Sequence, residues 1–434
     1  MNYLETIQYL YASAPMFQNI GAGAYKEGLS TTETLDEYFN HPHRNFKTIH
    51  IAGTNGKGST SHSIAAILQS AGYKVGLYTS PHLVDFRERI RVNGKMISEQ
   101  GVIDFVEKHR GFFEPLKPSF FELTTAMAFK YFADEKVDVA IVEVGLGGRL
   151  DCTNIISPCC SVITNISFDH TQFLGKTLAQ IATEKAGIIK SNTPVVIGEY
   201  VEETRSIFHE IAKKNNSPIY YAQDDSLIIS KKTGVYYDSY RIKDYDSELN
   251  FELRGLYQEK NLNTILWTIK TINGLGFEIS DAAIWSGLSH VCELTGLMGR
   301  WQILNEHPQI VCDTGHNVGG FQYIVPQLLA QSYKQLRFVF GMVGDKDVDA
   351  VLSILPTSAT YYFTQAKIPR ALNAETLKMH ALNFGLCGET YPTVSDALKA
   401  AVCDADSNDF IFVGGSSFVV ADLLSEGHYK LNEI

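Results

Sequence analysis

The chain has 434 residues, 45% of them hydrophobic, and its 37 basic and 48 acidic side chains leave a net charge of −11 at pH 7. This length and apolar content suffice for two hydrophobic cores, so we expect two domains. The negative charge argues against nonspecific binding to nucleic acid or to an anionic membrane, because both require a cationic surface. We therefore expect any bound nucleotide to be a small molecule.

The sequence carries no pattern of export or membrane insertion. Its first residues, MNYLE, contain neither a basic region nor an apolar run of signal-peptide length, and no segment approaches the roughly 20 apolar residues of a membrane span. The seven cysteines are odd in number and show no C-x-x-C spacing, which predicts reduced thiols rather than disulfides or a zinc site. We expect a cytoplasmic protein.

A strand followed by a helix is predicted early in the chain. Residues 48–52 form an apolar run typical of a buried strand. Residues 59–71 predict a helix, because Ile64, Ile67 and Leu68 recur at helical spacing. The sequence IAGTNGKGST connects the two elements, so a glycine-rich loop leads directly into the start of a helix.

This loop has the composition of a phosphate-binding loop. Gly53, Gly56 and Gly58 allow backbone N–H groups to turn inward, the helix start adds partial positive charge, and Lys57 adds a full one. The spacing departs from the common G-x-x-x-x-G-K-[ST] pattern, because Gly58 separates Lys57 from Ser59. The alternative is a plain strand-to-helix turn with a solvated lysine.

The remaining pattern of the first half predicts a doubly wound parallel sheet with helical crossovers. Short alternating stretches rich in Tyr, Asp, Ser and Lys then predict a small antiparallel β excursion, followed by two helices. The expected strands are 74–78, 137–144, 160–166 and 194–197, the excursion spans 220–251, and the helices span 256–275 and 281–288.

A second alternation of strands and helices begins after a glycine-rich break at residues 296–301. It predicts a second, Rossmann-like α/β domain, so the expected domains are 1–297 and 298–434. The expected elements are strands at 309–312, 336–340, 360–363 and 409–413, and helices from 320, near 348–355 and after the last strand.

Polar residues follow several of the predicted strands, at the sheet edge where ligands gather in parallel sheets. Ser80 follows the second strand, and Glu143 lies at the end of an apolar strand before a glycine-rich loop. A buried carboxylate needs a counter-charge, and Mg²⁺ prefers oxygen ligands. The alternatives are a turn cap before Pro81 for Ser80 and an ion pair with an arginine for Glu143.

An acid, an imidazole and a lysine follow along the same edge. Asp169 and His170 come after the next strand, and local chemistry favours Asp169 as the magnesium ligand because histidine is an uncommon one. Lys185 lies where a polar helix passes into an apolar segment. A lysine withdrawn from water loses its proton and can react with CO₂. From local sequence alone, a surface lysine is the preferred interpretation.

Further candidates lie in a basic cluster and in the second domain. Residues 87–91 contain three arginines, which indicate either a solvated segment or a site for an anionic substrate. Residues 313–317 and 413–417 follow two strands of the second domain, and Arg300 lies at the interdomain turn. We expect a nucleotide-binding cleft between the domains, while a structural Asp turn at 313 is the alternative.

Taken together, these motifs resemble the folylpolyglutamate synthase and dihydrofolate synthase family, within the Mur ligase superfamily. The resemblance runs from about residue 3 to 425. It rests on HIAGTNGKGS at 50–59, YTSPHL at 78–83, FELT at 121–124, EVGLGGRLDCTN at 143–154, HTQFLG at 170–175, EKAGIIK at 184–190 and DTGHN at 313–317.

The resemblance implies an ATP-dependent ligase that joins L-glutamate to a folate, to dihydropteroate or to both. The acceptor carboxylate attacks the γ-phosphate, and the glutamate amine displaces phosphate from the acyl phosphate to form an amide. The protein contributes positioning and electrostatics rather than covalent catalysis. The implied cofactors are ATP and Mg²⁺ at two sites, and we expect a monomer.

The resemblance also implies roles for individual residues. Lys185 matches a lysine that becomes carbamylated, and a carbamate could support the second Mg²⁺ where an ammonium would repel it. The implied nucleotide-binding residues are Gly53, Thr54, Asn55, Gly56, Lys57, Gly58, Ser59, Thr60, Gln258, Asn261, Arg300 and Asp313. The metal-binding set is Ser80, Glu143, His170 and Lys185; the glutamate- or folate-binding set is Arg89, Phe121, His316 and Ser416; and the catalytic set is Lys57, Lys185, Asp313 and His316.

Two other functions compete with this interpretation. A UDP-muramoyl amino-acid ligase uses the same acyl-phosphate route, but such enzymes carry an extra N-terminal domain, and only 52 residues precede Gly53 here. A non-enzymatic P-loop regulator would not need a second acceptor site. The chain departs from better-known family members at Gly315, at Val318 and at the Gly414–Gly415 pair.

Overall fold

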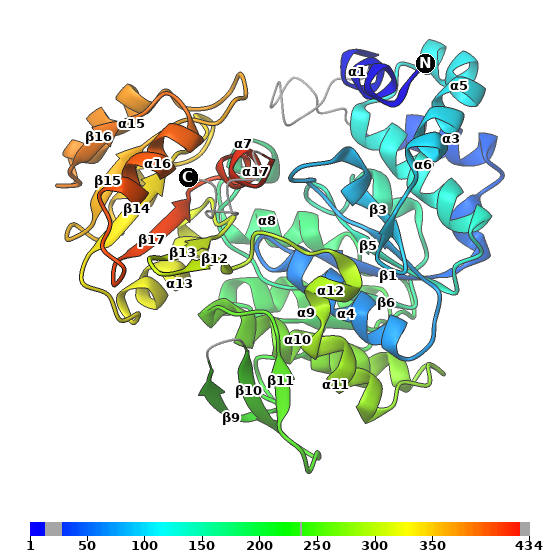
Figure 1. The fold of residues 1–434 in the computed structure, drawn as a ribbon. Helices are drawn as coiled ribbons and strands as arrows, with labels where there is room; N and C mark the ends of the chain where they lie inside the picture. Colours follow the sequence, from blue (N-terminus) through cyan, green and yellow to red (C-terminus); the bar gives the residue numbers. More distant parts are fainter. Residues whose placement is uncertain (14–27, 235–236, 426–434) are drawn as a thin grey trace. The chain divides into compact units, whose positions relative to one another are not determined.

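The computed structural model describes residues 1–13, 28–234 and 237–425, with the elements labelled in Figure 1. These residues form two compact units: unit 1 comprises Met1–Leu253 and Gln258–Leu297, and unit 2 comprises Arg254–Tyr257 and Met298–Ile434. The longer segment of unit 2 begins at Met298. The assignment of separate roles to the two units stays a prediction.

In the described part of unit 1, eight strands form one sheet in the order β4-β3-β2-β5-β1-β6-β7-β8. The six strands β2, β5, β1, β6, β7 and β8 run parallel to one another, as predicted. Ile51 of β1 lies in register with Glu143 of β5. The bounds are β1 Lys47–Ala52, β2 Val75–Tyr78, β3 Ile90–Val92, β4 Lys95–Met96, β5 Val139–Glu143, β6 Cys160–Ile163, β7 Val195–Ile197 and β8 Ile219–Tyr221.

One edge of this sheet differs from the prediction. The short strands β3 and β4 are antiparallel additions beside β2. The sequence indicates only a charged segment there. Arg89 and Arg91 alternate with Ile90 and Val92, but this alternation is too short to distinguish a strand from a solvent-exposed segment. All four of these side chains are buried, so this segment is part of the fold.

The antiparallel excursion is smaller than predicted. It forms a three-stranded sheet in the order β11-β10-β9, with bounds β9 Ile228–Thr233, β10 Asp238–Ile242 and β11 Leu249–Phe251. The predicted start at residue 220 is wrong, because β8 pairs in parallel with β7 in the main sheet. Residues 235 and 236, within the predicted span, lie outside the described residues.

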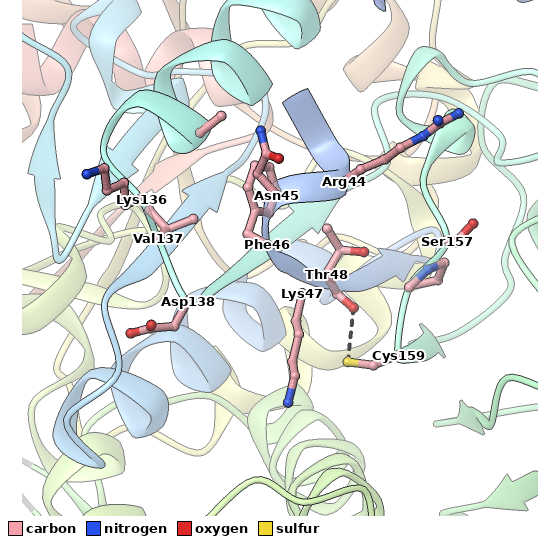
Figure 2. A pocket seen from close by; sticks show the side chains of 12 residues that line it. Arg44, Asn45, Phe46, Lys47, Thr48, Lys136, Val137, Asp138, Ser157 and Cys159 are labelled. Atoms are coloured by element: carbon pink, nitrogen blue, oxygen red, sulfur yellow. Dashed lines mark hydrogen bonds between the residues drawn. The ribbon is translucent and has the colours of Figure 1, made fainter. Parts of the chain in front are cut away.

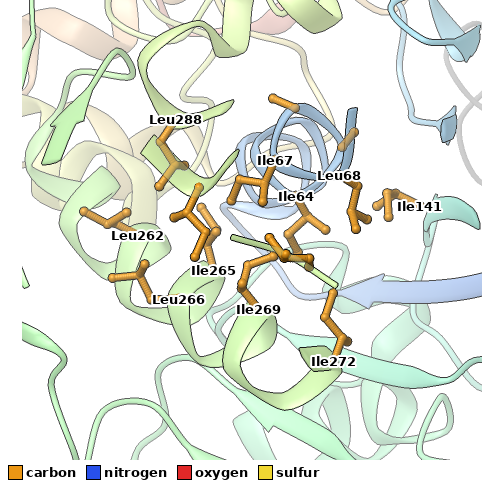
Figure 3. Packing of buried hydrophobic residues seen from close by; sticks show 14 of the residues in the cluster. Ile64, Ile67, Leu68, Ile141, Leu262, Ile265, Leu266, Ile269, Ile272 and Leu288 are labelled. Carbon is orange, nitrogen blue, oxygen red and sulfur yellow. The ribbon is translucent and has the colours of Figure 1, made fainter. Parts of the chain in front are cut away.

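Helices pack on both faces of the main sheet, because successive side chains of a strand point to opposite faces. Ile141 of β5 packs into a cluster with Ile64 and Ile67 of one helix, whereas Ala140 and Val142 face a second cluster. Figure 3 shows the first cluster, in which α4 and α10 interleave their apolar side chains. The helices of unit 1 are α1 Tyr3–Ser13, α3 Ser30–Tyr38, α4 Lys57–Ser70, α5 Glu99–Leu116, α6 Phe120–Asp134, α7 Thr171–Leu174, α8 Leu178–Ala186, α9 Glu202–Lys214, α10 Leu256–Asn273 (whose first two residues count with unit 2), α11 Asp281–Ser289 and α12 Val291–Thr295.

In the described residues of unit 2, six strands form a sheet in the order β12-β13-β17-β14-β15-β16. All are parallel except β12, which is an antiparallel edge strand, so the predicted Rossmann-like pattern is confirmed. The bounds are β12 Gln302–Glu306, β13 Gln309–Cys312, α13 Val318–Leu329, β14 Leu336–Phe340, α14 Val348–Leu352, β15 Thr360–Phe363, α15 Ala374–Leu382, β16 Gly388–Thr390, α16 Val394–Cys403, β17 Phe410–Gly414 and α17 Ser417–Ser425.

None of the helices within residues 1–13, 28–234 and 237–425 combines the length and the apolar character that crossing a membrane requires.

Candidate active site

The phosphate loop connects β1 to α4 and depends on two glycines with positive φ. Gly53 has φ 146° and Gly56 has φ 83°, values that L side chains rarely adopt. A Cβ on Gly53 would lie 1.9 Å from Oγ1 of Thr164, and a Cβ on Gly56 would lie 2.3 Å from Oδ1 of Asn261. Only glycine fits at either position, so the loop can approach its neighbours closely.

The segment that follows β6 holds the phosphate loop in place. The backbone N–H of Asn55 donates to Oδ1 of Asn165 at 2.8 Å, and the N–H of Thr54 donates to the carbonyl of Asn165 at 3.0 Å. The hydroxyl of Thr54 donates to the carbonyl of Ser167 at 3.1 Å. Sequence reasoning missed Asn165 and Ser167 as supports of the site, although their position just after a strand was the available signal.

Two polar residues of α10 lie against the phosphate loop. Nε2 of Gln258 donates to the hydroxyl of Ser59 at 3.1 Å, and Nδ2 of Asn261 donates to Oε1 of Gln258 at 2.8 Å. All three side chains are buried. The structure therefore brings Gln258 and Asn261 to the loop, as the predicted nucleotide site requires.

Two lysines converge on the carbonyl oxygen of Gly53. Nζ of Lys57 donates to it at 3.1 Å and to the carbonyl of Thr54 at 3.1 Å, and Nζ of Lys185 donates to it at 2.9 Å. Lys185 is only 4% exposed, so the local interpretation as a surface lysine is wrong. Burial, assisted by the charge of Lys57, lowers the pKa of Lys185 to about 7.

A carboxylate lies at the ends of the neighbouring strands. Glu143 is the last residue of β5 and is 4% exposed, and its Oε2 accepts the backbone N–H of Ser80 at 3.4 Å. Ser80 follows β2, the strand beside β5. Phe121 packs on the loop after Glu143, because a Cβ on Gly145 would lie 2.4 Å from its ring. Glu143, Ser80 and Phe121 thus occupy one edge of the sheet.

The predicted histidine ligand, His170, is the N-cap residue of helix α7. His170 has φ 49°, and its backbone N–H donates to Oδ1 of Asp169 at 2.8 Å. The negative charge of Asp169 partly offsets the lowering of the Lys185 pKa by burial and by Lys57, so Asp169 lies within electrostatic reach of that amine. Across the described residues, no three His, Cys, Asp or Glu side chains gather in a ready-made metal site.

The residues nevertheless fit a magnesium nucleotide. Glu143 is a buried carboxylate and Ser80 supplies a hydroxyl, both of them ligands that Mg²⁺ accepts. In the described part of the chain, the buried Oγ1 of Thr60, in the first turn of α4, has no hydrogen-bond partner. Lys185 holds an amine that loses its proton near neutral pH, so conversion to a carbamate would supply the missing anionic oxygens.

Two arginines of the basic segment, Arg87 and Arg89, have different environments. Arg87 pairs with Asp85 at 2.8 Å, whereas Arg89 is buried and its Nε donates to Nδ1 of His82 at 2.8 Å. Its guanidinium lies 5.2 Å from the centroid of the Phe120 ring. Burial and the charge of Arg89 lower the pKa of His82 to about 3, so this imidazole stays neutral and accepts the hydrogen bond.

In unit 2, the buried carboxylate of Asp313, which follows β13, accepts several hydrogen bonds. Its Oδ2 accepts the hydroxyl of Tyr257 and the backbone N–H of Trp301, the latter at 2.8 Å, and its Oδ1 accepts the N–H of Gly315 at 2.8 Å. Burial raises the pKa of Asp313, although these donors and the charge of Arg300 oppose the shift. The carboxylate is thereby fixed at the end of its strand.

Three further predicted residues lie at this edge of the second sheet. Arg300 donates to the hydroxyl of Thr314, and Nδ1 of His316 donates to the carbonyl of Thr314 at 3.0 Å. Ser416 follows β17, is 2% exposed, and accepts the N–H of Phe418 at 3.1 Å. β13 and β17 are neighbours, so the structure brings Arg300, Asp313, His316 and Ser416 to one edge of unit 2.

Comparison with known proteins identifies relatives of both units. Residues 51–266 match the Mur ligase middle domain, and residues 299–417 match the Mur ligase glutamate ligase domain. The chain is 32% identical over 412 residues to the dihydrofolate synthase/folylpolyglutamate synthase of Bacillus subtilis (strain 168), covering 92% of this chain and 94% of the relative.

Solved structures show the same fold. E. coli FolC in complex with DHPP and ADP superposes with a TM-score of 0.84 at 29% identity and covers 99% of both chains. A bifunctional folylpolyglutamate synthase/dihydrofolate synthase with Mn, AMPPNP and L-glutamate bound gives a TM-score of 0.81 at 29% identity, covering 99% of this chain and 98% of the other.

Proposed function

Because the chain belongs to the dihydrofolate synthase/folylpolyglutamate synthase family of Mur ligases, we propose that it uses ATP to attach L-glutamate to a folate, to dihydropteroate or to both. The observation that carries this proposal is the convergence of Lys57 and Lys185 on the phosphate loop. The solved relatives that hold ADP with DHPP, or AMPPNP with Mn and L-glutamate, support the same substrate set.

The reaction has two steps. A carboxylate oxygen of the acceptor attacks the γ-phosphorus of ATP, the bond to the β-phosphate oxygen breaks, and ADP leaves. The amine of glutamate then attacks the acyl carbon, the carbon–oxygen bond to phosphate breaks, and an amide forms with loss of a proton. Neither step needs a covalent bond to the protein, so the side chains act by position and charge.

Lys57 stabilises the transferring phosphoryl group. Its ammonium is held at the loop by the carbonyls of Gly53 and Thr54, so it can turn to the phosphates with little reorganisation. Gly53 to Thr60 supply backbone N–H groups and the first turn of α4, and Gln258 and Asn261 support that turn. The triphosphate therefore has a prepared binding site in unit 1.

Ser80 and Glu143 would hold Mg²⁺, which supplies positive charge to the β- and γ-phosphates when it is bound. We assign the second metal position to His170 and to a carbamate formed on Lys185. The buried amine with a pKa near 7 supports that assignment, since only the neutral amine reacts with CO₂.

The remaining predicted residues are assigned to the other substrates. In unit 2, Arg300 and Asp313 would contact the nucleotide, and His316 and Ser416 the glutamate. In unit 1, the positive charge of Arg89 lies beside the ring of Phe120, and Phe121 packs beside Glu143. A cation next to aromatic rings suits an aromatic acceptor that carries a carboxylate. We also propose that the protein acts as a monomer in the cytoplasm, and light scattering tests the former.

The test is a phosphate-release assay with Mg-ATP and L-glutamate that compares dihydropteroate with tetrahydrofolate as the acceptor. Release that depends on glutamate and on either acceptor supports the proposal, and the ratio of the two rates defines which synthase activity dominates. Release with a UDP-muramoyl peptide and with neither pterin would transfer the assignment to the cell-wall ligases. Absence of release with all acceptors would favour a nucleotide-binding regulator.

A further inference from the structure

The sequence motif that begins with Glu143 ends in Asn154, whose side chain has no role in the proposed reaction. Asn154 is 8% exposed. Its Nδ2 donates to the carbonyl oxygen of Arg149 at 3.0 Å and to the carbonyl oxygen of Gly187 at 3.1 Å. One buried amide therefore links the loop that follows Glu143 to the turn that follows Lys185.

The two linked segments lie in direct backbone contact. A Cβ on Gly148 would lie 2.8 Å from the carbonyl oxygen of Glu184, and a Cβ on Gly187 would lie 2.4 Å from Cα of Arg149. Real Cβ atoms do not approach other atoms this closely, so the contact requires glycine at both positions. The backbone N–H of Arg149 also donates to the carbonyl of Glu184 at 2.8 Å. The loop after β5 thus rests against the backbone that carries Lys185.

The chemistry of the contacts fixes the orientation of the amide. A carbonyl oxygen can only accept, so the two contacts use both N–H groups of Asn154. Its Oδ1 is buried and has no hydrogen-bond partner among the residues that the structure describes. The side chains of Arg149 and Glu184 form a second link at 2.8 Å, but Arg149 is 53% exposed, and water weakens such a pair. The amide link is buried and is not weakened in this way.

Asn154 is itself held on both sides by β1. Before it in the chain, the hydroxyl of Thr153 shares a hydrogen bond of 2.8 Å with Nε2 of His50. After it, the thiol and the backbone N–H of Cys159 donate to the carbonyl of Thr48 at 3.1 and 2.8 Å, and Figure 2 shows the bond from the thiol. The segment that contains Asn154 is therefore anchored to the central strand of unit 1.

We propose that Asn154 is a positioning residue for Lys185. By joining the turn after Lys185 to the loop after Glu143, its amide keeps the lysine amine at the carbonyl of Gly53, 2.9 Å away, beside the phosphate loop. The inference rests on the proposed function for the role that it gives Lys185. Residues that support metal- or phosphate-binding side chains in this way contribute roughly 10- to 100-fold to activity.

Two substitutions separate hydrogen bonding from packing. Asn154→Ala removes the amide, whereas Asn154→Asp keeps its size but turns a carboxylate oxygen toward the two carbonyls. We expect kcat to fall about 10- to 100-fold in both variants, and further in Asn154→Asp, with the KM for ATP within about threefold of the parent. The KM should persist because Asn165 and Gln258 still hold the phosphate loop. Parent-like kinetics of Asn154→Asp would overturn the proposal, because the side chain would then only fill space.

Hydrogen exchange of the full-length protein, followed by mass spectrometry, measures the link without substrates. Asn154→Ala should speed exchange about tenfold in both linked segments, residues 145–151 and 184–190, since two hydrogen bonds are lost. The phosphate loop, residues 53–60, should stay within about twofold because its own hydrogen bonds remain. Unchanged exchange in either linked segment would overturn the proposal.

Asn263→Ala is the matched control. Asn263 is also 8% exposed; its amide donates to the carbonyl of Ala222 at 2.6 Å, and its Oδ1 accepts the N–H of Leu227 at 2.9 Å. This variant should speed exchange near residues 222–227 and leave kcat within about threefold. An equal loss of kcat in both variants would overturn the proposal, because it would show a general effect of lost stability.

Failure of the proposed reaction is a separate result. If the parent protein releases no phosphate with any acceptor, the proposed function is wrong, and the exchange rates still decide whether Asn154 holds the two segments together. If the parent is active and Asn154→Ala matches it in kcat, the proposed function stands and the positioning role is wrong.

Discussion

Lys57 and Lys185 donate hydrogen bonds to the same carbonyl oxygen, that of Gly53, at 3.1 and 2.9 Å. Two ammonium groups on one acceptor repel each other, and Lys185 is also buried. Both effects lower the pKa of Lys185, to about 7, with burial as the larger cause. The Lys185 amine beside the phosphate loop can therefore lose its proton near pH 7 and react in its neutral form.

Carbamylation of Lys185 should depend on pH in a defined direction. Only the neutral amine reacts with CO₂, so the carbamate should increase as pH rises through about 7 in metal-free protein. A lysine in water would require a pH near its ordinary pKa of 10.5. Carbon-13 NMR with labelled bicarbonate measures the carbamate, and Lys185→Arg is the control that should lack the signal. An unchanged signal in that variant would assign the carbamate to another lysine.

Lys57→Met should lose most of its turnover. Removal of this charge from a prepared site should cost about 2 to 4 kcal/mol of transition-state stabilisation, or roughly 30- to 1,000-fold in kcat. The same substitution removes a like charge beside Lys185, so the carbamate transition should move to higher pH. Steady-state kinetics and the NMR titration measure the two effects. Normal kcat together with an unmoved titration would exclude this arrangement of the two lysines.

The free energy of unfolding of the metal-free protein should depend on pH because the Lys185 amine is buried. The pKa of Lys185 is lowered from 10.5 to about 7 on folding, so between these values the unfolded chain binds more protons and stability rises with pH. Lys185→Met should therefore be more stable than the parent below about pH 7, on the order of 3 to 5 kcal/mol, and the difference should shrink toward pH 10. Urea denaturation across this range measures it. A difference independent of pH would indicate packing rather than ionisation.

Gly56→Ala and Gly72→Ala form a matched pair. Both glycines have positive φ, 83° and 90°, but a Cβ on Gly56 meets Asn261 whereas a Cβ on Gly72 meets nothing within 4 Å. Each change should destabilise the fold by about 1 kcal/mol through backbone strain. Only Gly56→Ala should also displace the phosphate loop, with a loss of roughly 100-fold in kcat/KM for ATP. Similar kinetics for the two variants would mean that the loop tolerates displacement.

Local sequence patterns are sufficient to predict the parts of the fold that depend on interactions between residues close together in the sequence. The apolar run before Gly53 and the helical spacing after it predicted β1, α4 and the phosphate loop. The position of Glu143 at the end of an apolar strand predicted a buried carboxylate at the sheet edge. These features follow from periodicity and from the conformational freedom of glycine, both of which are visible in a short window.

The burial and the supporting contacts of several side chains, by contrast, depend on residues distant in the sequence. Lys185 was interpreted locally as a surface lysine because its hydrogen-bond partner, Gly53, is 132 residues away. Asn165 was not recognised as a support for Asn55, 110 residues away. Arg89 was placed in a charged cluster, although strand pairing and Phe120 bury it. Side-chain burial of this kind is decided by topology, which local patterns do not fix.

The central claim is that the terminal phosphoryl group of ATP passes to the carboxylate of a pterin-linked acceptor. The most direct measurement uses an acceptor with both carboxylate oxygens labelled with oxygen-18, together with Mg-ATP and L-glutamate, and analyses the released phosphate by mass spectrometry. The acyl-phosphate route predicts one labelled oxygen in each phosphate and one in the new amide. Phosphate released at the normal rate without label would contradict the account, because the acceptor oxygen would never have been bonded to phosphorus.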